Sequence, residues 1–163
     1  MNALESLLYD VAHLFLMPVL VLILCALLYA FAAFGAFALE ALQRRRGRHR
    51  SELRAVHLAG ARASDDLELW ILKRLEWLRI TSRTAPMLGL VATMIPMGPA
   101  LLALTRSDAQ SVGENLVVAF SAVILALVAA SLCFLVLTVR RRWLLEELRA
   151  IERDVADAAT ASH

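Results

Sequence analysis

The stretch TAPMLGLVATMIPMGPALLAL, residues 84–104, lies in the middle of the chain and decides its fold class. It contains three prolines and two glycines, carries no charge and has only two hydroxyl side chains. Proline removes a backbone donor and clashes with the preceding turn, which a soluble helix rarely tolerates three times. A transmembrane helix tolerates proline where neighbouring groups or water satisfy the freed carbonyls. The stretch therefore predicts a membrane-spanning helix, part of which faces protein or a hydrated lumen.

The composition of the whole chain is that of a membrane protein. Of its 163 residues, 60% are hydrophobic and the mean hydropathy is +0.66, against roughly 45–50% apolar residues in soluble domains. Three uncharged stretches, 14–39, 84–105 and 116–139, can each cross a hydrocarbon core of ~30 Å, which needs about 20 helical residues. Because lipid offers the backbone no hydrogen-bond partner, we predict an all-α membrane protein with three transmembrane helices in a single unit, 1–163.

The placement of the basic residues predicts the topology. No Lys or Arg precedes the first span, eleven lie within 44–83, one is Arg106 and five lie within 140–163. Basic residues are in excess on the cytoplasmic side of a membrane. We therefore expect a protein of the cell (inner) membrane with its N-terminus outside and with the loop 43–83 and the tail 140–163 in the cytoplasm. The basic run QRRRGRHR, 43–50, is interpreted as an anchor at an anionic leaflet and not as a nucleic-acid site.

Amphipathic segments adjoin the second and third spans. SDDLELWILKRLEWLRI, 64–80, begins with Ser64 as an N-cap and places apolar residues at steps of three and four. RRRWLLEELRAIERDVADAA, 140–159, has the same periodicity directly after the third span. No helix-breaking residue separates either segment from its span. We therefore predict two helical stalks that extend spans two and three into the cytoplasm, with the three tryptophans as interfacial anchors and packing residues.

Residues that carry enzyme chemistry are not arranged in any recognisable site. Cys25 and Cys133 lie within predicted spans, where cysteine behaves as a small hydrophobe. The four histidines share no metal-ligand spacing, and no glycine-rich phosphate loop is present. We expect no enzyme, no cofactor, no metal and no nucleic-acid partner.

Spans two and three each carry a narrow face of small residues at steps of three and four. Such faces let transmembrane helices approach closely. We expect them to pack helices together and to hold the subunits of an oligomer. The faces consist of Ala85, Gly89, Ala92, Pro96, Ala100 and Ala103 in span two, and of Ala119, Ala122, Ala126, Ala129 and Cys133 in span three.

The segment TAPMLGLVATMIPM, followed after a short turn by VAFSAVILALVAASLCF and a basic amphipathic tail, resembles the MotA/TolQ/ExbB proton-channel family over about residues 70–150. The resemblance implies a ring of subunits, pentameric in that family, around single-span partner helices of the ExbD, TolR or MotB kind that carry a membrane-embedded aspartate. The three predicted spans contain no Asp, Glu, Lys, Arg or His. Because a chain without an intramembrane titratable group cannot relay protons alone, a proton carrier from another chain would be needed.

The resemblance also implies candidate pore-lining residues. The pore threonine of the family's second span corresponds to Thr93, and Thr84 opens the same motif. In span three, a glutamate and a pore threonine of the family correspond to Val118 and Val123, with Ser121 as the nearest hydroxyl. The hydroxyl of Thr93 has two possible partners: a partner carboxylate or water in a pore, or the carbonyl of the preceding helical turn.

Two functions remain open at this point. The first is an energy transducer, in which the chain forms the ring of a complex driven by proton motive force. The second is an oligomeric membrane scaffold that assembles with partners and passes no ions. The apolar residues at positions 118 and 123 favour the scaffold, and the match around Thr93 favours the transducer.

Overall fold

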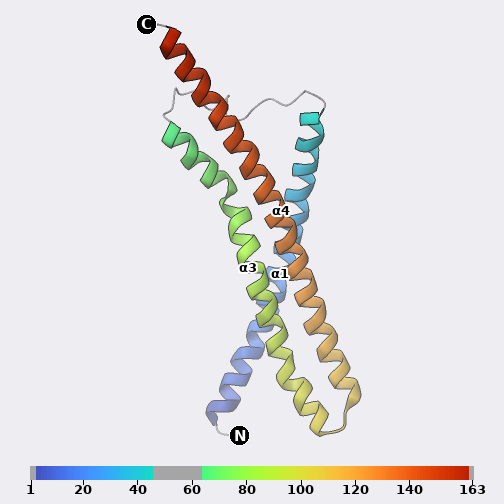
Figure 1. Cartoon of the computed structure of the whole chain (residues 1–163). Coiled ribbons are helices and arrows are strands. Elements are labelled where there is room, and N and C mark those ends of the chain that lie inside the picture. The colour runs from blue at the N-terminus through green and yellow to red at the C-terminus, as the bar shows by residue number, and fades with distance from the viewer. Residues whose placement is uncertain (1–2, 46–63, 162–163) are drawn as a thin grey trace.

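The computed structural model describes residues 3–45 and 64–161, which form three long helices (Figure 1). They are α1 (Ala3–Arg45), α3 (Ser64–Thr105) and α4 (Ala109–Ala161). Each is long and apolar enough to cross a membrane. The prediction of an all-α protein with three helices capable of spanning a membrane is therefore confirmed. Most of the basic run 43–50 lies outside the described residues.

Helices α3 and α4 are antiparallel neighbours joined by a tight turn at one end, here named the turn end (Figure 1). The amide of Asp108 donates to the carbonyl of Ala103 at 3.0 Å, and Ser107 adopts a left-handed φ of 58°. Asp108 then caps α4, because its carboxylate accepts hydrogen bonds from the hydroxyl and the amide of Ser111. These bonds lower the pKa of Asp108 below its usual value. The turn thus ends one helix and begins the next within three residues.

Helix α1 crosses behind the pair formed by α3 and α4 in the view of Figure 1. Val19 and Ile23 are buried against Ala92, Ala122 and Ala126. Nearer the opposite end of the bundle, here named the basic end, α1 continues to pack on both helices. Its described residues up to Phe15 are exposed. Helix α1 therefore covers one side of the pair and leaves the other side open.

The small-residue faces of α3 and α4 are buried against each other within one chain. All eleven residues predicted for these faces are buried. A Cβ atom added to Gly89 would lie 2.9 Å from the Cβ of Ala126 and 3.3 Å from Val123 Cγ2, which shows how closely the helices approach. The faces therefore pack two helices of the same chain together, as expected, and their predicted role in joining subunits stays a prediction.

Toward the basic end the contact between α3 and α4 changes to larger side chains. The buried residues there are Leu67, Ile71, Leu75 and Leu78 on α3, with Val136, Leu144, Leu148 and Ile151 on α4. Neither helix is interrupted where this change occurs, although α3 contains Pro86, Pro96 and Pro99. The predicted continuity of both helices beyond their apolar runs is therefore observed. That these ends are cytoplasmic stalks stays a prediction.

Candidate functional site

The open side of α3 and α4 contains a groove of about 740 Å³ near the basic end. On α4 the groove includes Phe134, which lies nine residues before Trp143. At 3.6 residues per turn these two residues lie on opposite faces of α4. Trp143 stacks on Phe37 of α1 at 5.3 Å, so the groove faces away from α1. The lining residues are Ile71, Leu72, Leu75, Arg79, Ser82 and Arg83 of α3, with Phe134, Leu137, Thr138, Arg141, Arg142, Leu145, Glu146 and Arg149 of α4.

Two of the predicted pore residues share the open side with this groove. Thr93 follows Ser82 by eleven residues on α3, and Val123 precedes Phe134 by eleven residues on α4. Eleven residues are close to three full helical turns, so each residue lies on the face that lines the groove. Thr93 and Val123 are both partly exposed. They therefore lie toward the turn end on the same side of the molecule.

Hydrogen bonding and packing already engage Thr93 and Val123 within the chain. The Thr93 hydroxyl donates to the carbonyl of Leu90 at 2.8 Å, which is the second of the two possibilities for this residue. Val123 lies against Gly89 and forms the edge of the contact between α3 and α4. In the single chain, then, neither side chain presents a free polar group to the open side.

The other three candidates lie on different faces. Thr84 is nine residues from Thr93, which places it about 180° away around α3, and its hydroxyl donates to the carbonyl of Ile80 at 3.0 Å. Val118 precedes Trp143 by 25 residues, close to seven turns, which puts it on the face of α4 that packs on α1 farther along. Ser121 is exposed and one turn from Val118. The five candidates therefore do not line one surface of the chain.

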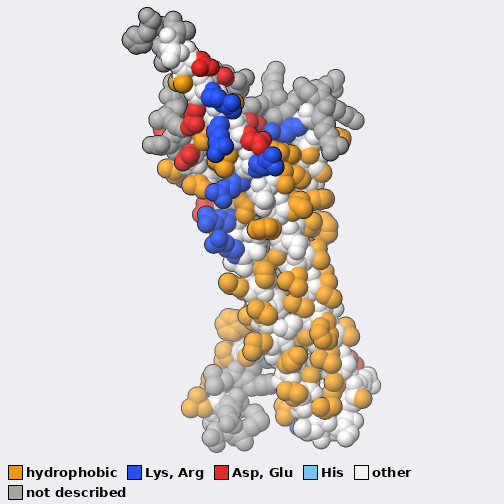
Figure 2. Space-filling model, viewed as in Figure 1, with side chains coloured by type: hydrophobic (Ala, Val, Ile, Leu, Met, Phe, Trp, Pro, Cys, Tyr) orange, Lys and Arg blue, Asp and Glu red, His pale blue; other side chains and the backbone are white. Residues whose placement is uncertain are grey.

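Along the axis of the bundle, basic side chains of α3 lie closer to the turn end than the sequence indicates. Gly89 and Ala126 are level, because their side-chain positions nearly touch. At ~1.5 Å per residue, Arg83 lies about 9 Å from that level, whereas Arg140 at the end of the apolar run of α4 lies about 21 Å from it. Arg83 is thus about two turns closer to the turn end than Arg140. Figure 2 shows Lys and Arg side chains descending from the basic end into a surface that is otherwise apolar.

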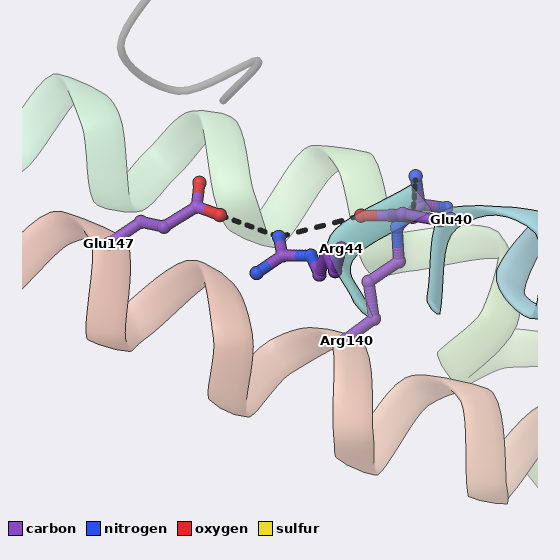
Figure 3. A network of polar contacts seen from close by, with 4 residues as sticks. All are labelled: Glu40, Arg44, Arg140 and Glu147. Atoms are coloured by element: carbon purple, nitrogen blue, oxygen red, sulfur yellow. Dashed lines mark hydrogen bonds and ion pairs between the residues drawn. The ribbon is translucent and has the colours of Figure 1, made fainter. Parts of the chain in front are cut away.

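A second polar feature ties α1 to α4 at the basic end (Figure 3). Arg44 of α1 pairs with Glu147 of α4 and with Glu40 one turn earlier, and Arg140 of α4 pairs with Glu40 at 3.1 Å. These four side chains are only 17–23% exposed. The Arg44 guanidinium also lies 4.5 Å above the ring of Trp143, a favourable cation–π contact.

Sequence reasoning did not single out this four-residue network. A signal was available, because Glu40 directly follows the first uncharged run and Arg140 directly follows the third. Opposite charges at the same ends of two spans indicate a pair wherever the spans are neighbours. What the sequence lacked was the neighbour relation between α1 and α4.

The described residues offer no evident metal site: within residues 3–45 and 64–161, no three His, Cys, Asp or Glu side chains lie close enough together to hold an ion. A comparison with curated proteins and one with solved structures gave no match. A comparison with protein-family models matched residues 30–153, well over half of the chain, to the MotA/TolQ/ExbB proton channel family. The resemblance predicted from the sequence is confirmed, and the chain belongs to this family.

Proposed function

We propose that this chain is a ring-forming subunit of a membrane complex driven by proton motive force, in which a single-span partner carries an aspartate into the membrane. The observation that supports this most is the family match combined with the uncharged runs 14–39, 84–105 and 116–139. A conducting complex built from this chain needs a titratable group from elsewhere. In this role the chain assembles and conducts, and it has no enzymatic activity.

The orientation belongs to the same proposal. Eleven Lys and Arg residues in 44–83 and five in 140–163 favour a cytoplasmic basic end in the inner membrane. A cysteine placed at Ser107 is then labelled in intact cells by a reagent that cannot cross the membrane, while one at Ala156 is not. Labelling of the cysteine at position 156, without labelling at position 107, would show that the orientation is the reverse of the one proposed.

Thr93 gives the proposal its sharpest test. Its hydroxyl is near the middle of the uncharged part of α3 and on the open side, and it can exchange its bond with Leu90 for one with water or a partner carboxyl. Thr93→Val keeps the shape and removes the hydroxyl. An unmade hydrogen bond to a desolvated group costs about 1–3 kcal/mol, so proton flux should fall roughly tenfold to a hundredfold.

The flux is measured in vesicles that contain this chain together with a candidate partner, a single-span protein that carries an aspartate in its span. Thr105→Val is the matched control, because Thr105 also donates to a carbonyl three residues back, at 2.7 Å, but lies at the turn end. If wild type and Thr93→Val give equal flux, and both exceed the partner-free control, then Thr93 is not part of the proton path.

A non-conducting scaffold is the second candidate function. Its support is that Val118 and Val123 are apolar and that Val123 already packs on Gly89 within the chain. The same vesicles decide between the two functions. Absence of flux in the wild type, with the oligomer and its partner intact, would establish the scaffold.

A further inference from the structure

The groove between α3 and α4 combines an apolar floor with unusually many cations. Its lining includes five arginines and one glutamate. The glutamate, Glu146, accepts a hydrogen bond from Arg142 at 2.8 Å, which neutralises that arginine. Among the residues that the structure describes, the remaining four arginines have no carboxylate partner; they are Arg79, Arg83, Arg141 and Arg149. The groove is therefore strongly positive.

The arginines are spread along the length of the groove. Arg83 lies about 12 Å closer to the turn end than Arg140, and Arg141 and Arg142 follow Arg140 directly. Between the heights of Arg83 and Arg140, α4 contributes the apolar side chains of Phe134 and Leu137 to the wall of the groove. A lipid headgroup layer is several ångströms thick on each side of the hydrocarbon core. The backbone positions of the groove arginines therefore extend from Arg83 at the inner end to Arg149 at the outer end, which is more than the ~5–7 Å of a headgroup layer.

We propose that the groove binds an anionic phospholipid, with the phosphodiester held by Arg79 and Arg83 and the acyl chains lying along Phe134 and Leu137. Arginine is suited to phosphate because its planar guanidinium forms two parallel hydrogen bonds to phosphate oxygens. Long basic side chains also extend toward the headgroup layer while their methylenes cover apolar surface. A soluble anion would use only the cationic part of this groove, whereas a phospholipid uses its floor as well.

Native mass spectrometry of the full chain, released from vesicles of phosphatidylglycerol and phosphatidylcholine, tests the proposal. Wild type should retain phosphatidylglycerol in clear preference to phosphatidylcholine. Arg79→Gln with Arg83→Gln should reduce that retention at least about tenfold, because both charged donors to the phosphate are lost. Arg106→Gln with Arg153→Gln removes the same charge outside the groove and should leave retention unchanged. Equal retention of both lipids by wild type would overturn the proposal without reference to any variant.

Two further arms separate other occupants of the groove. An excess of inorganic phosphate or glycerol phosphate should not displace the retained lipid, and displacement by either would show that the apolar floor contributes nothing. A cysteine at Thr138, in a chain with Cys25→Ala and Cys133→Ala, should form no crosslink to another polypeptide in membranes. A crosslink there would show that a second copy or a protein partner covers the groove, and would exclude the lipid.

Discussion

Two regions of the same pair of helices are held together by opposite kinds of side chain. From Ala85 to Ala103, α3 meets α4 through alanine, glycine and proline, and at Gly89 the helices nearly touch. From Leu67 to Leu78 the same helix meets α4 through leucine and isoleucine. In water, burying a large aliphatic side chain contributes about 1.5–3 kcal/mol. In lipid that gain disappears, and close approach of small residues replaces it.

We name the two parts of this contact the small seam (Ala85 to Ala103 of α3) and the large seam (Leu67 to Leu78 of α3), and we expect the pair to leave the hydrocarbon core where one changes to the other. On α3 this change falls between Leu78 and Ala85, and on α4 between Cys133 and Val136. These two intervals lie at similar heights, because Gly89 and Ala126 are level and the helices are antiparallel. The position of Arg79 and Arg83 in the first interval agrees with a headgroup layer at this height.

The largest effect is expected from emptying the large seam. Leu75 is 4% exposed and Leu75→Ala leaves a cavity, which costs about 2–5 kcal/mol. Thermal unfolding in detergent measures the loss. Leu69→Ala is the control, because Leu69 is 53% exposed on the same helix, and it should change the midpoint little. Similar losses for both variants would show that the large seam does not hold α3 and α4 together.

The next effect comes from overfilling the small seam. Gly89→Leu forces a side chain into a space where even a Cβ would lie 2.9 Å from Ala126, and overpacking costs about 1–3 kcal/mol. Gly35→Leu is the matched control, because nothing lies within 4 Å of a Cβ added there. The two variants are compared by unfolding midpoint and by protease resistance. If Gly35→Leu is the more damaged, the seam is not the tight contact described above.

A smaller effect is expected where charges supplement the large seam. Glu147→Gln removes one partner of Arg44 in a network whose side chains are 17–23% exposed. Because solvent screens part of the interaction, the loss should be about 1–2 kcal/mol, between the values for exposed and buried pairs. Glu146→Gln breaks the exposed pair with Arg142 and should change the unfolding midpoint hardly at all. A salt titration adds a check, since the effect of Glu147→Gln should persist at high ionic strength.

The smallest effect concerns the turn that closes the small seam. The folded-state pKa of Asp108 is lowered because its carboxylate accepts bonds from Ser111. Its contribution to stability is therefore complete above the unfolded pKa of about 3.9 and is lost as the pH falls through the lower folded value. Asp108→Asn should make the unfolding midpoint vary less with pH below about 4. An identical pH profile for both proteins would show that this cap does not contribute.

Much of the fold could be predicted, because local patterns determine it. Steps of three and four placed Gly89 and Ala126 on packing faces, and both are buried. The pairing of those faces within one chain could not be predicted, because a stripe of small residues does not say which helix covers it. For the same reason the depth of Arg83 was missed: it depends on the register between α3 and α4, which is a long-range property.

The candidate site was less predictable than the fold. Thr93 was singled out by family resemblance, but its bond to Leu90 and the distribution of the other candidates around the helices are three-dimensional facts. The arginine-lined groove had no sequence signal, since its lining comes from segments some sixty residues apart, such as Arg83 and Arg142. In the sequence these arginines look like ordinary interfacial anchors. That they line one groove becomes evident only when the relative position of α3 and α4 is known.

The unbroken course of α4 has a mechanical consequence. Its 53 residues run from the turn end to the far tip of the molecule, a length of about 80 Å at ~1.5 Å per residue. A rod of this length acts as a lever, so a tilt of about 5° with its fulcrum at the turn end would carry the far tip by roughly 7 Å. In such a tilt, a small displacement beside Val123 corresponds to a larger one at Ile151. The leucines of α3 pack against this part of α4.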